Sequence, residues 1–329
     1  KPIPISELSN SEIKFDLVID ISVLSRVHTW SIPHFKRSVK NYIVITSSKS
    51  IKGRRQFRTG EMLRFKQLTS KTENGGYSEN ESLRTTLEIF LVDIFRKSSF
   101  RPGQLPIMNR ALRSESVIGL LPTGGGKSMT YQLSTFLQPG ATIIVDPIKS
   151  LMRDQVKSLA DNLVDCAGFV NSSMNRAQKE IEHKKLISGQ LQFFFISPER
   201  FLIQEFRNML ESINSNNIYF SYCVIDEAHC VSEWGHDFRT SYLFLGRNAS
   251  QYAKTCSTKP ITLFGLTATA SYDVLADIQR ELSGDPENLD SILSDEAIVR
   301  FETFNRHELQ YQVMVVNIPN DKPYKNSWC

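Results

Sequence analysis

From about residue 82 onward, short apolar runs alternate with amphipathic stretches. Five runs have the length and composition of buried strands: SVIGLL at 116–121, TIIVD at 142–146, QFFFI at 192–196, YCVID at 222–226 and TLFGL at 262–266. Between them, apolar residues recur at helical spacing, as at 148–163 and 199–213. Strands that are apolar throughout and alternate with helices predict an α/β fold, with a mainly parallel sheet covered by helices on both faces.

The first 80 residues have a weaker pattern. Residues 15–24 (FDLVIDISVL) and 42–47 (YIVITS) are rich in β-branched residues and predict two strands. Residues 49–71 then carry eight Lys or Arg side chains and a single acid, Glu61. Such a run could contact a phosphate backbone, but a solvated basic connector is the more common use of this composition.

A polar, turn-rich stretch at 72–81 separates the two patterns. We therefore expect a small α+β N-terminal extension at 1–80, an α/β lobe at 81–300 and a connecting segment at 301–329. The chain has 329 residues, of which 40% are hydrophobic, enough for one large or two ordinary cores.

Composition narrows the class of protein. No apolar run reaches the roughly 18 residues of a membrane span, and the first ten residues lack the layout of a signal peptide. Lys1 is not expected to be the natural start, because the chain does not begin with Met. The five cysteines are widely spaced without a C-x-x-C pair, which favours reduced thiols in an intracellular protein. We expect such a protein to be cytoplasmic if it is bacterial and nuclear if it is eukaryotic. The net charge of +4 permits nucleic-acid binding without arguing for it.

The stretch LLPTGGGKSMTYQL, residues 120–133, joins the first apolar run to a helical pattern. Glycines let the backbone wrap around phosphate oxygens, and N–H groups at a helix start face a bound anion. In that use Lys127 would reach the β- and γ-phosphates, and the Ser128 hydroxyl would ligate Mg²⁺. The strict phosphate-loop pattern has glycine where Leu121 stands, so an ordinary turn with a surface lysine is the alternative.

A second polar cluster, Asp226-Glu227-Ala228-His229, ends the fourth apolar run. An aspartate at the end of a buried strand, facing a phosphate loop, can hold Mg²⁺, usually through water. Glu227 could orient or deprotonate the attacking water. Two acids that cap the following helix are the alternative. Because ligands bind beyond the carboxyl ends of parallel strands, the loop and the acid pair together predict a core that hydrolyses nucleoside triphosphates.

Several segments resemble motifs of superfamily 2 helicases. Residues 120–133, Asp226–His229 and Thr267-Ala268-Thr269 are similar to motifs I, II and III of that superfamily, which commonly begins its phosphate loop without the first glycine. FRKSSFRPGQ at 95–104 and CVSEWGHDFRTSY at 230–242 resemble motif 0 and the aromatic-rich loop of RecQ-like DNA helicases. The remaining matches are DPIKSLMRDQ at 146–155 with motif Ia and ISPERF at 196–201 with motif Ib, so the resemblance covers residues from about 85 to 311.

The resemblance implies a RecA-like phosphate-loop fold with ATP and Mg²⁺ as cofactors. Gln104 would hydrogen-bond to the adenine edge, and Arg101 would support the nucleotide. Asp226 would bind Mg²⁺ together with Ser128, and Glu227 would be the catalytic base. The residues that hold the phosphates would be Thr123, Gly124, Gly125, Gly126, Lys127 and Ser128.

The resemblance also implies coupling to single-stranded and partly duplex DNA. His229, Thr267 and Thr269 would couple hydrolysis to movement. The residues that sense the strand would be Trp234, His236, Phe238 and Arg239. Apart from the family, the rings of Trp234, Phe238 and Tyr242 could each contribute about 1–3 kcal/mol per base by stacking. A core-facing aromatic cluster is the alternative, against which the polar neighbours within 232–237 argue.

The chain departs from the family in two places. Arg96-Lys97 stands where the family usually has glycine and an aromatic residue that often stacks on adenine, so we expect ATP preference with weaker affinity. A helicase of this type also needs a second RecA-like lobe, in the same or another chain, and residues 300–313 resemble the connection to it. Because that lobe supplies an arginine finger worth about 10³–10⁵ in turnover, we expect a fragment with feeble ATP hydrolysis.

The leading hypothesis is the first motor lobe of a RecQ-like helicase, which would couple ATP hydrolysis to 3′-to-5′ translocation and unwinding of DNA in repair, recombination or defence against foreign DNA. One alternative is a nucleotide- and DNA-binding fragment without appreciable turnover. Another is an RNA helicase, against which motif 0 and the aromatic loop argue. Asp16 and Asp20 flank the first predicted strand, but acids at strand edges seldom form metal sites, so we predict no nuclease there.

Overall fold

The computed structural model describes three short N-terminal strands and most of the chain from Arg64 to Arg300. The strands are β1 (Leu17–Asp20), β2 (Ser25–Val27) and β3 (Tyr42–Ile45). The other described ranges are 64–138, 140–216, 218–232, 239–257, 259–283 and 292–300. Within these ranges, no helix combines the length and the apolar character needed to cross a membrane.

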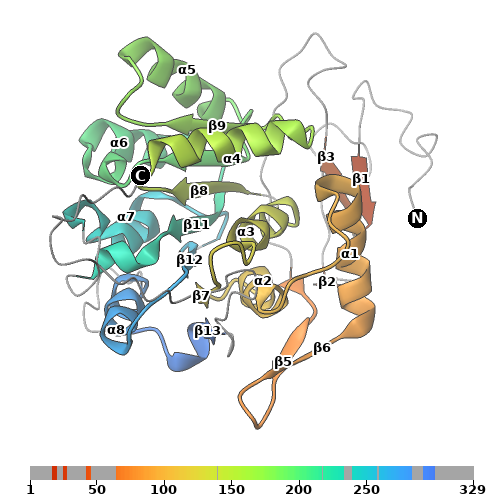
Figure 1. The fold of residues 1–329 in the computed structure, drawn as a ribbon. Helices are drawn as coiled ribbons and strands as arrows, with labels where there is room; N and C mark the ends of the chain where they lie inside the picture. Colours follow the sequence, from red (N-terminus) through yellow and green to blue (C-terminus); the bar gives the residue numbers. More distant parts are fainter. Residues whose placement is uncertain are drawn as a thin grey trace, which may run out of the picture.

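A parallel sheet of seven strands forms the centre of the described structure, in the order β13-β7-β12-β11-β8-β10-β9 (Figure 1). The strands are β7 (Val117–Leu120), β8 (Ala141–Val145), β9 (Ala167–Val170), β10 (Phe193–Ile196), β11 (Phe220–Asp226), β12 (Thr262–Thr267) and β13 (Ile298–Arg300). The five predicted strands are confirmed. The two edge strands, β9 and β13, were not predicted, because each is short and neither is apolar throughout.

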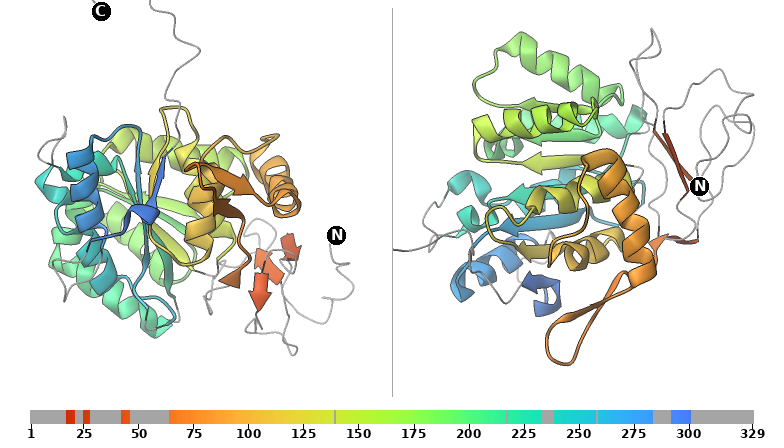
Figure 2. Two further views of the ribbon diagram at one scale, coloured as in Figure 1. Left: turned by 90° about the horizontal axis from the view of Figure 1, so that it is seen from below. Right: turned by 45° about the vertical axis from the view of Figure 1, so that its right-hand side comes forward.

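Helices cover both faces of this sheet (Figures 1 and 2). Neighbouring strand residues point to opposite faces, so that Ile144 packs with the first group of helices and Ile143 with the second. The first group is α1 (Glu81–Phe95), α2 (Gln104–Leu112), α3 (Lys127–Phe136) and α4 (Lys149–Asp161). The second group is α5 (Arg176–Ile187), α6 (Gln204–Ser212), α7 (Leu245–Tyr252) and α8 (Tyr272–Glu281). This arrangement confirms the predicted α/β fold.

The helix predicted at 199–213 is divided in two. Pro198–Leu202 forms a 3₁₀ turn, η2, and α6 begins only at Gln204, after extended backbone at Ile203 (φ −89°, ψ 121°). The apolar spacing identified side chains that are buried, Phe206 and Leu210 among them. It did not reveal the break, because one extended residue changes the backbone without changing which residues are apolar. The other 3₁₀ turns are η3 (Ile213–Asn216), η4 (Ala228–Val231), η5 (Thr240–Tyr242) and η6 (Asp295–Ala297).

An antiparallel hairpin, which precedes the seven-stranded sheet in the sequence, packs on helix α2. It consists of β5 (Thr69–Lys71) and β6 (Tyr77–Glu79), and its turn contains Gly75 at φ +81°. The Asn109 Oδ1 atom on α2 accepts hydrogen bonds from the N–H groups of Leu68 (2.7 Å) and Thr69 (3.4 Å). The start of strand β5 is therefore held against α2, and the polar stretch at 72–81 contains the turn of the hairpin and strand β6. Two further antiparallel pairs are β1 with β3, and β2 with β4 (Arg64–Phe65).

A partly buried acid caps the start of helix α7. Glu281, at the end of α8, accepts a hydrogen bond from the Gly246 N–H at 2.9 Å, and the N–H groups of Phe244 and Leu245 also hydrogen-bond to it. Burial raises the pKa of Glu281 to about 7, although these hydrogen bonds and the nearby Arg247 act in the opposite direction.

Glu281→Gln is expected to flatten part of the pH dependence of stability. Because the folded pKa lies above the ordinary value of 4.5, the folded protein binds an extra proton between these values and loses stability as the pH rises through them. The variant lacks this titration, so its unfolding free energy should gain about 1 kcal/mol relative to wild type between pH 5 and pH 8. Urea unfolding at both pH values measures the difference, with the exposed Glu211→Gln as control. A difference that stays constant with pH would contradict the raised pKa.

Candidate functional site

The glycine-rich loop predicted to hold phosphates follows strand β7 directly. Gly124 and Gly126 both have φ +79°, a backbone conformation that residues with side chains rarely adopt. The Gly125 N–H donates to the Pro122 carbonyl at 2.8 Å, which closes the turn. Helix α3 begins at Lys127, so its first N–H groups are available to an anion in the loop.

The acid pair lies at the same edge of the sheet as this loop. Along strand β12, Thr267 pairs with Leu120 of β7 and Leu266 pairs with Asp226 of β11. The Lys127 Nζ atom lies 3.5 Å from Glu227 Oε1. The structure thus brings together the two clusters that lie 100 residues apart in the sequence.

Burial dominates the electrostatics of the acids. Asp226 is 7% exposed, and burial raises its pKa to about 6, while Lys127 and the Glu227 N–H act to lower it. Asp146, at the end of the neighbouring strand β8, is also buried. Burial raises the pKa of Asp146 to about 7, and the charges of Asp226 and Glu227 contribute to this shift. Carboxyl groups that share a buried region carry mutual repulsion, which a divalent cation would relieve.

The acids at this edge of the sheet suit a Mg²⁺ ion, which binds few protein ligands, better than a metal ion whose ligands all come from the protein. Among the described residues, no three His, Cys, Asp or Glu side chains converge into a complete metal cage. Mg²⁺ commonly takes one or two carboxylates and completes its octahedron with phosphate oxygens and water. Asp226, at the end of β11, and the hydroxyl of Ser128, in the first turn of α3, are the candidate protein ligands.

A chain of polar contacts leads away from the loop through Glu227. This residue has left-handed backbone (φ 49°, ψ 48°), and its carboxylate contacts Lys127 and, at 3.4 Å, the Nδ1 atom of His229. His229 Nδ1 also lies 3.0 Å from Thr267 Oγ1, and the Thr267 hydroxyl donates to the Thr269 carbonyl at 3.0 Å. Because that hydroxyl proton is used on Thr269, His229 Nδ1 must carry a proton to donate to Thr267.

Gln104 ties the segment before α2 to the phosphate loop. It is 4% exposed; its Nε2 donates to the Gly126 carbonyl at 2.9 Å, and its Oε1 accepts from the Arg101 N–H at 2.8 Å. A Cβ atom at Gly126 would overlap this amide, and the φ of +79° at Gly126 also favours glycine there. Both ends of the amide are therefore engaged, and contact with an adenine edge would need these hydrogen bonds to be exchanged.

The loop after the acid pair is described only in part, and Trp234, His236 and Phe238 lie outside the described residues. Arg239 donates from its backbone N–H to the Cys230 carbonyl at 2.9 Å and from Nη1 to the Pro147 carbonyl at 3.3 Å. The prediction that Tyr242 offers a stacking face is wrong. Tyr242 is fully buried, and its hydroxyl donates to the Asp226 carbonyl at 3.0 Å. Its position in the turn η5 directs the ring inward, so it anchors this loop to β11.

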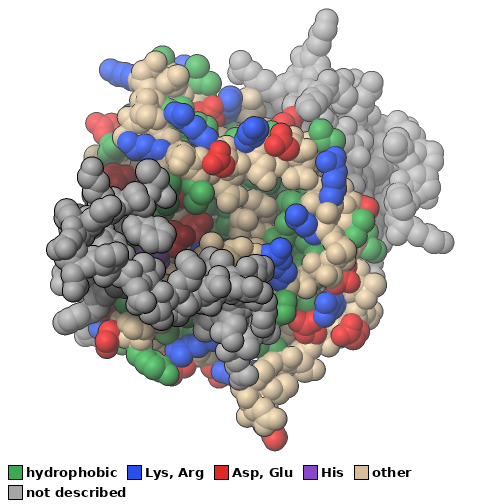
Figure 3. Space-filling view, viewed as in Figure 1, with side chains coloured by type: hydrophobic (Ala, Val, Ile, Leu, Met, Phe, Trp, Pro, Cys, Tyr) green, Lys and Arg blue, Asp and Glu red, His purple; other side chains and the backbone are tan. Residues whose placement is uncertain are grey.

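Sequence reasoning missed Asp146. Like Asp226, it is an acid that directly ends an apolar run, and this repeated pattern was the available signal. Its Oδ1 accepts from the Ile148 N–H at 2.8 Å. Charge distribution provides no comparable signal: basic and acidic side chains are interspersed over the described part of the face in Figure 3.

Comparisons with known proteins identify the family of the chain and several relatives. The family model described as DEAD/DEAH box helicase matches residues 101–278. The ATP-dependent DNA helicase RecQ of Haemophilus influenzae is 37% identical over 195 residues, which cover 59% of this chain and 29% of that protein. The probable ATP-dependent DNA helicase RecS of Bacillus subtilis is 37% identical over 222 residues, 66% of this chain and 42% of that protein.

Among solved structures, the Pyrococcus furiosus Hef helicase domain aligns with a TM-score of 0.41 and 20% identity, over 58% of this chain and 38% of that chain. The chain thus spans less than half the length of the two curated relatives. Since the family model covers more than half of the chain, the chain belongs to the DEAD/DEAH box helicase family, and RecQ helicases are among its relatives.

Proposed function

We propose that this chain is the nucleotide-binding motor lobe of a RecQ-like DNA helicase, which couples ATP hydrolysis to 3′-to-5′ movement on single-stranded DNA and to unwinding. The observation that carries the proposal is the meeting of the phosphate loop and the acid pair, with Lys127 Nζ 3.5 Å from Glu227 Oε1. The names of the relatives, ATP-dependent DNA helicases, support the choice of nucleotide and nucleic acid.

The contacts suggest how each residue acts on the triphosphate. Lys127, now paired with Glu227, would turn to the β- and γ-phosphates, and the loop glycines would offer their N–H groups to the same oxygens. Glu227, released from Lys127, would orient the attacking water and accept its proton. Asp226 and Ser128 would hold Mg²⁺, which neutralises charge on the phosphate oxygens when bound.

The polar chain beyond Glu227 is the proposed route of coupling. His229 contacts Glu227 and Thr267 at once, so a change in Glu227 would alter the contacts of the segment at Thr267–Thr269. Arg239 contacts the Pro147 carbonyl just before α4, which would join the loop at 230–242 to a second segment similar to a helicase motif. Binding of single-stranded DNA at these segments would thus change the position of Glu227.

We expect single-stranded DNA to stimulate ATP hydrolysis several-fold more strongly than RNA of the same sequence. Single-turnover assays, with radiolabelled ATP and excess protein, detect hydrolysis even where turnover is slow. Stimulation by RNA alone would favour an RNA helicase. Binding of ATP and DNA without any hydrolysis would favour a binding fragment. Unwinding of duplexes with 3′ or 5′ tails, by a form that carries both lobes, would test the direction.

A further inference from the structure

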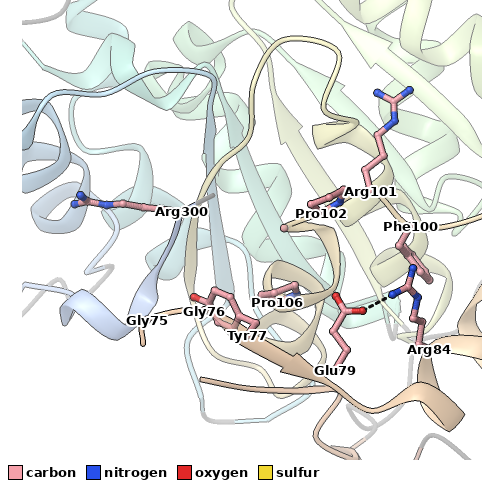
Figure 4. Close-up of a pocket in the computed structure, with 11 residues that line it drawn as sticks. Gly75, Gly76, Tyr77, Glu79, Arg84, Phe100, Arg101, Pro102, Pro106 and Arg300 are labelled. Carbon is pink, nitrogen blue, oxygen red and sulfur yellow. Dashed lines mark hydrogen bonds and ion pairs between the residues drawn. The ribbon is translucent and has the colours of Figure 1, made fainter. Parts of the chain in front are cut away.

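A pocket of about 470 Å³ lies between the β5–β6 hairpin and the start of helix α2 (Figure 4). Its size is within the range of about 300–1,000 Å³ found for small-molecule sites. Flat, largely apolar side chains form much of its wall: Tyr77 of the hairpin, Phe100, Pro102 and Pro106. Arg84, Arg101 and Arg300 also line the pocket, with Glu79 as the acid among them, so the pocket suits a planar ring that carries an anionic group.

The pocket adjoins the phosphate loop through the segment 101–104. Arg101 lines the pocket, and its Cδ atom lies 3.9 Å from the position that a Cβ atom on Gly126 would occupy. In Figure 4 the Arg101 side chain points away from the hairpin. Gln104 follows the pocket-lining Gly103 and hydrogen-bonds to the Gly126 carbonyl. A single ligand could therefore place phosphates in the loop and a planar group in the pocket.

The hairpin wall is fixed before any ligand arrives. Asn109 on α2 holds the backbone at Leu68 and Thr69, and the Tyr77 ring packs against the core that contains α2. Two residues along β6, Glu79 forms an ion pair with Arg84 of α1 at 2.7 Å, at one side of the pocket in Figure 4. A ring held in this way loses little freedom on binding, which favours affinity.

We propose that this pocket receives the nucleoside of the nucleotide whose phosphates occupy the loop, with the Tyr77 ring stacked on the base. The inference rests on the proposed function and adds to it a binding residue from outside the segments similar to helicase motifs. Lys97, at the position where the family usually has an aromatic residue, is exposed and has no ring. The hairpin would supply that ring from a stretch 20 residues earlier in the chain.

Tyr77→Leu keeps an apolar side chain against α2 but removes the flat ring, and it should weaken ATP binding about tenfold, the value of one stacked base. Tyr77→Phe keeps the ring and should bind ATP as wild type does. Isothermal titration calorimetry of the chain with ATP and with inorganic tripolyphosphate measures both. Tripolyphosphate has no base, so its affinity should be equal in all variants. Ser78→Ala, on the opposite, exposed side of strand β6, is the matched control, and thermal unfolding verifies that each variant is folded.

The outcomes separate this inference from the proposed function. If wild type binds ATP and folded Tyr77→Leu binds it equally well, or if Tyr77→Phe is as weak as Tyr77→Leu, the pocket assignment is overturned and the proposed function stands. If Tyr77→Leu lowers the affinity for tripolyphosphate as much as the affinity for ATP, Tyr77 acts on the fold and not on the base, and the pocket assignment is overturned. If the wild-type chain binds neither ligand, the proposed function itself fails.

Discussion

Lys127→Ala is expected to remove measurable ATP binding. The Lys127 side chain is only 15% exposed and lies against Glu227 at the mouth of the loop, so its charge would meet the phosphates in a partly desolvated place. Truncating one partner of a buried charged contact costs about 2–5 kcal/mol, which corresponds to a loss of about 30-fold or more in affinity. Lys127 also lowers the pKa of Asp226, so its removal would raise that pKa further and weaken Mg²⁺ binding.

Calorimetric titration with Mg²⁺ and ATP measures this effect. Lys184→Ala is the matched control, because Lys184 also pairs with a glutamate but is 72% exposed on helix α5. The control should bind ATP as wild type does. Unchanged ATP affinity in folded Lys127→Ala would mean that the loop does not hold the triphosphate, and the motor interpretation would fail with it.

The loop and the acid pair could be predicted from sequence because each is a local pattern. Glycines followed by Lys127, and an acid at the end of an apolar run, can be recognised in the sequence alone. Their proximity also followed, because the ends of parallel strands share one edge of a sheet. The five central strands could be predicted for a related reason, because burial on both faces of the sheet leaves an uninterrupted apolar run in the sequence.

Contacts between distant segments could not be predicted in this way. No local pattern shows that Gln104 hydrogen-bonds to Gly126, or that Asn109 holds the hairpin backbone. The hairpin itself reads as a polar boundary, since three of the six residues in its strands are exposed and Tyr77 is the one large apolar side chain that they place against the core. Tyr242 shows the same limit, because the residue types in a loop do not determine which ring turns inward.

Glu227→Gln is expected to separate binding from hydrolysis. Glutamine cannot accept the proton of the attacking water, and loss of a general base typically lowers the rate about 10²–10⁴-fold. ATP affinity should be retained or increased, because Lys127 would no longer be paired with a charged carboxylate at 3.5 Å. Single-turnover hydrolysis of radiolabelled ATP measures the rate, and calorimetry measures the affinity.

The matched control for this variant is Glu180→Gln, which removes an equally charged side chain that is 59% exposed and paired with Lys184. It should leave both the rate and the affinity unchanged.

His229→Ala provides a second comparison: it removes the contact between Glu227 and Thr267 without removing the carboxylate of Glu227. Its basal hydrolysis should therefore exceed that of Glu227→Gln, whereas its stimulation by DNA should be lost. If Glu227→Gln hydrolysed ATP at the wild-type rate, the base would have to be another group. Asp146, the other acid buried beside Asp226, would then be the first residue to test, because a carboxyl group whose pKa is raised to about 7 is suited to accept a proton near neutral pH.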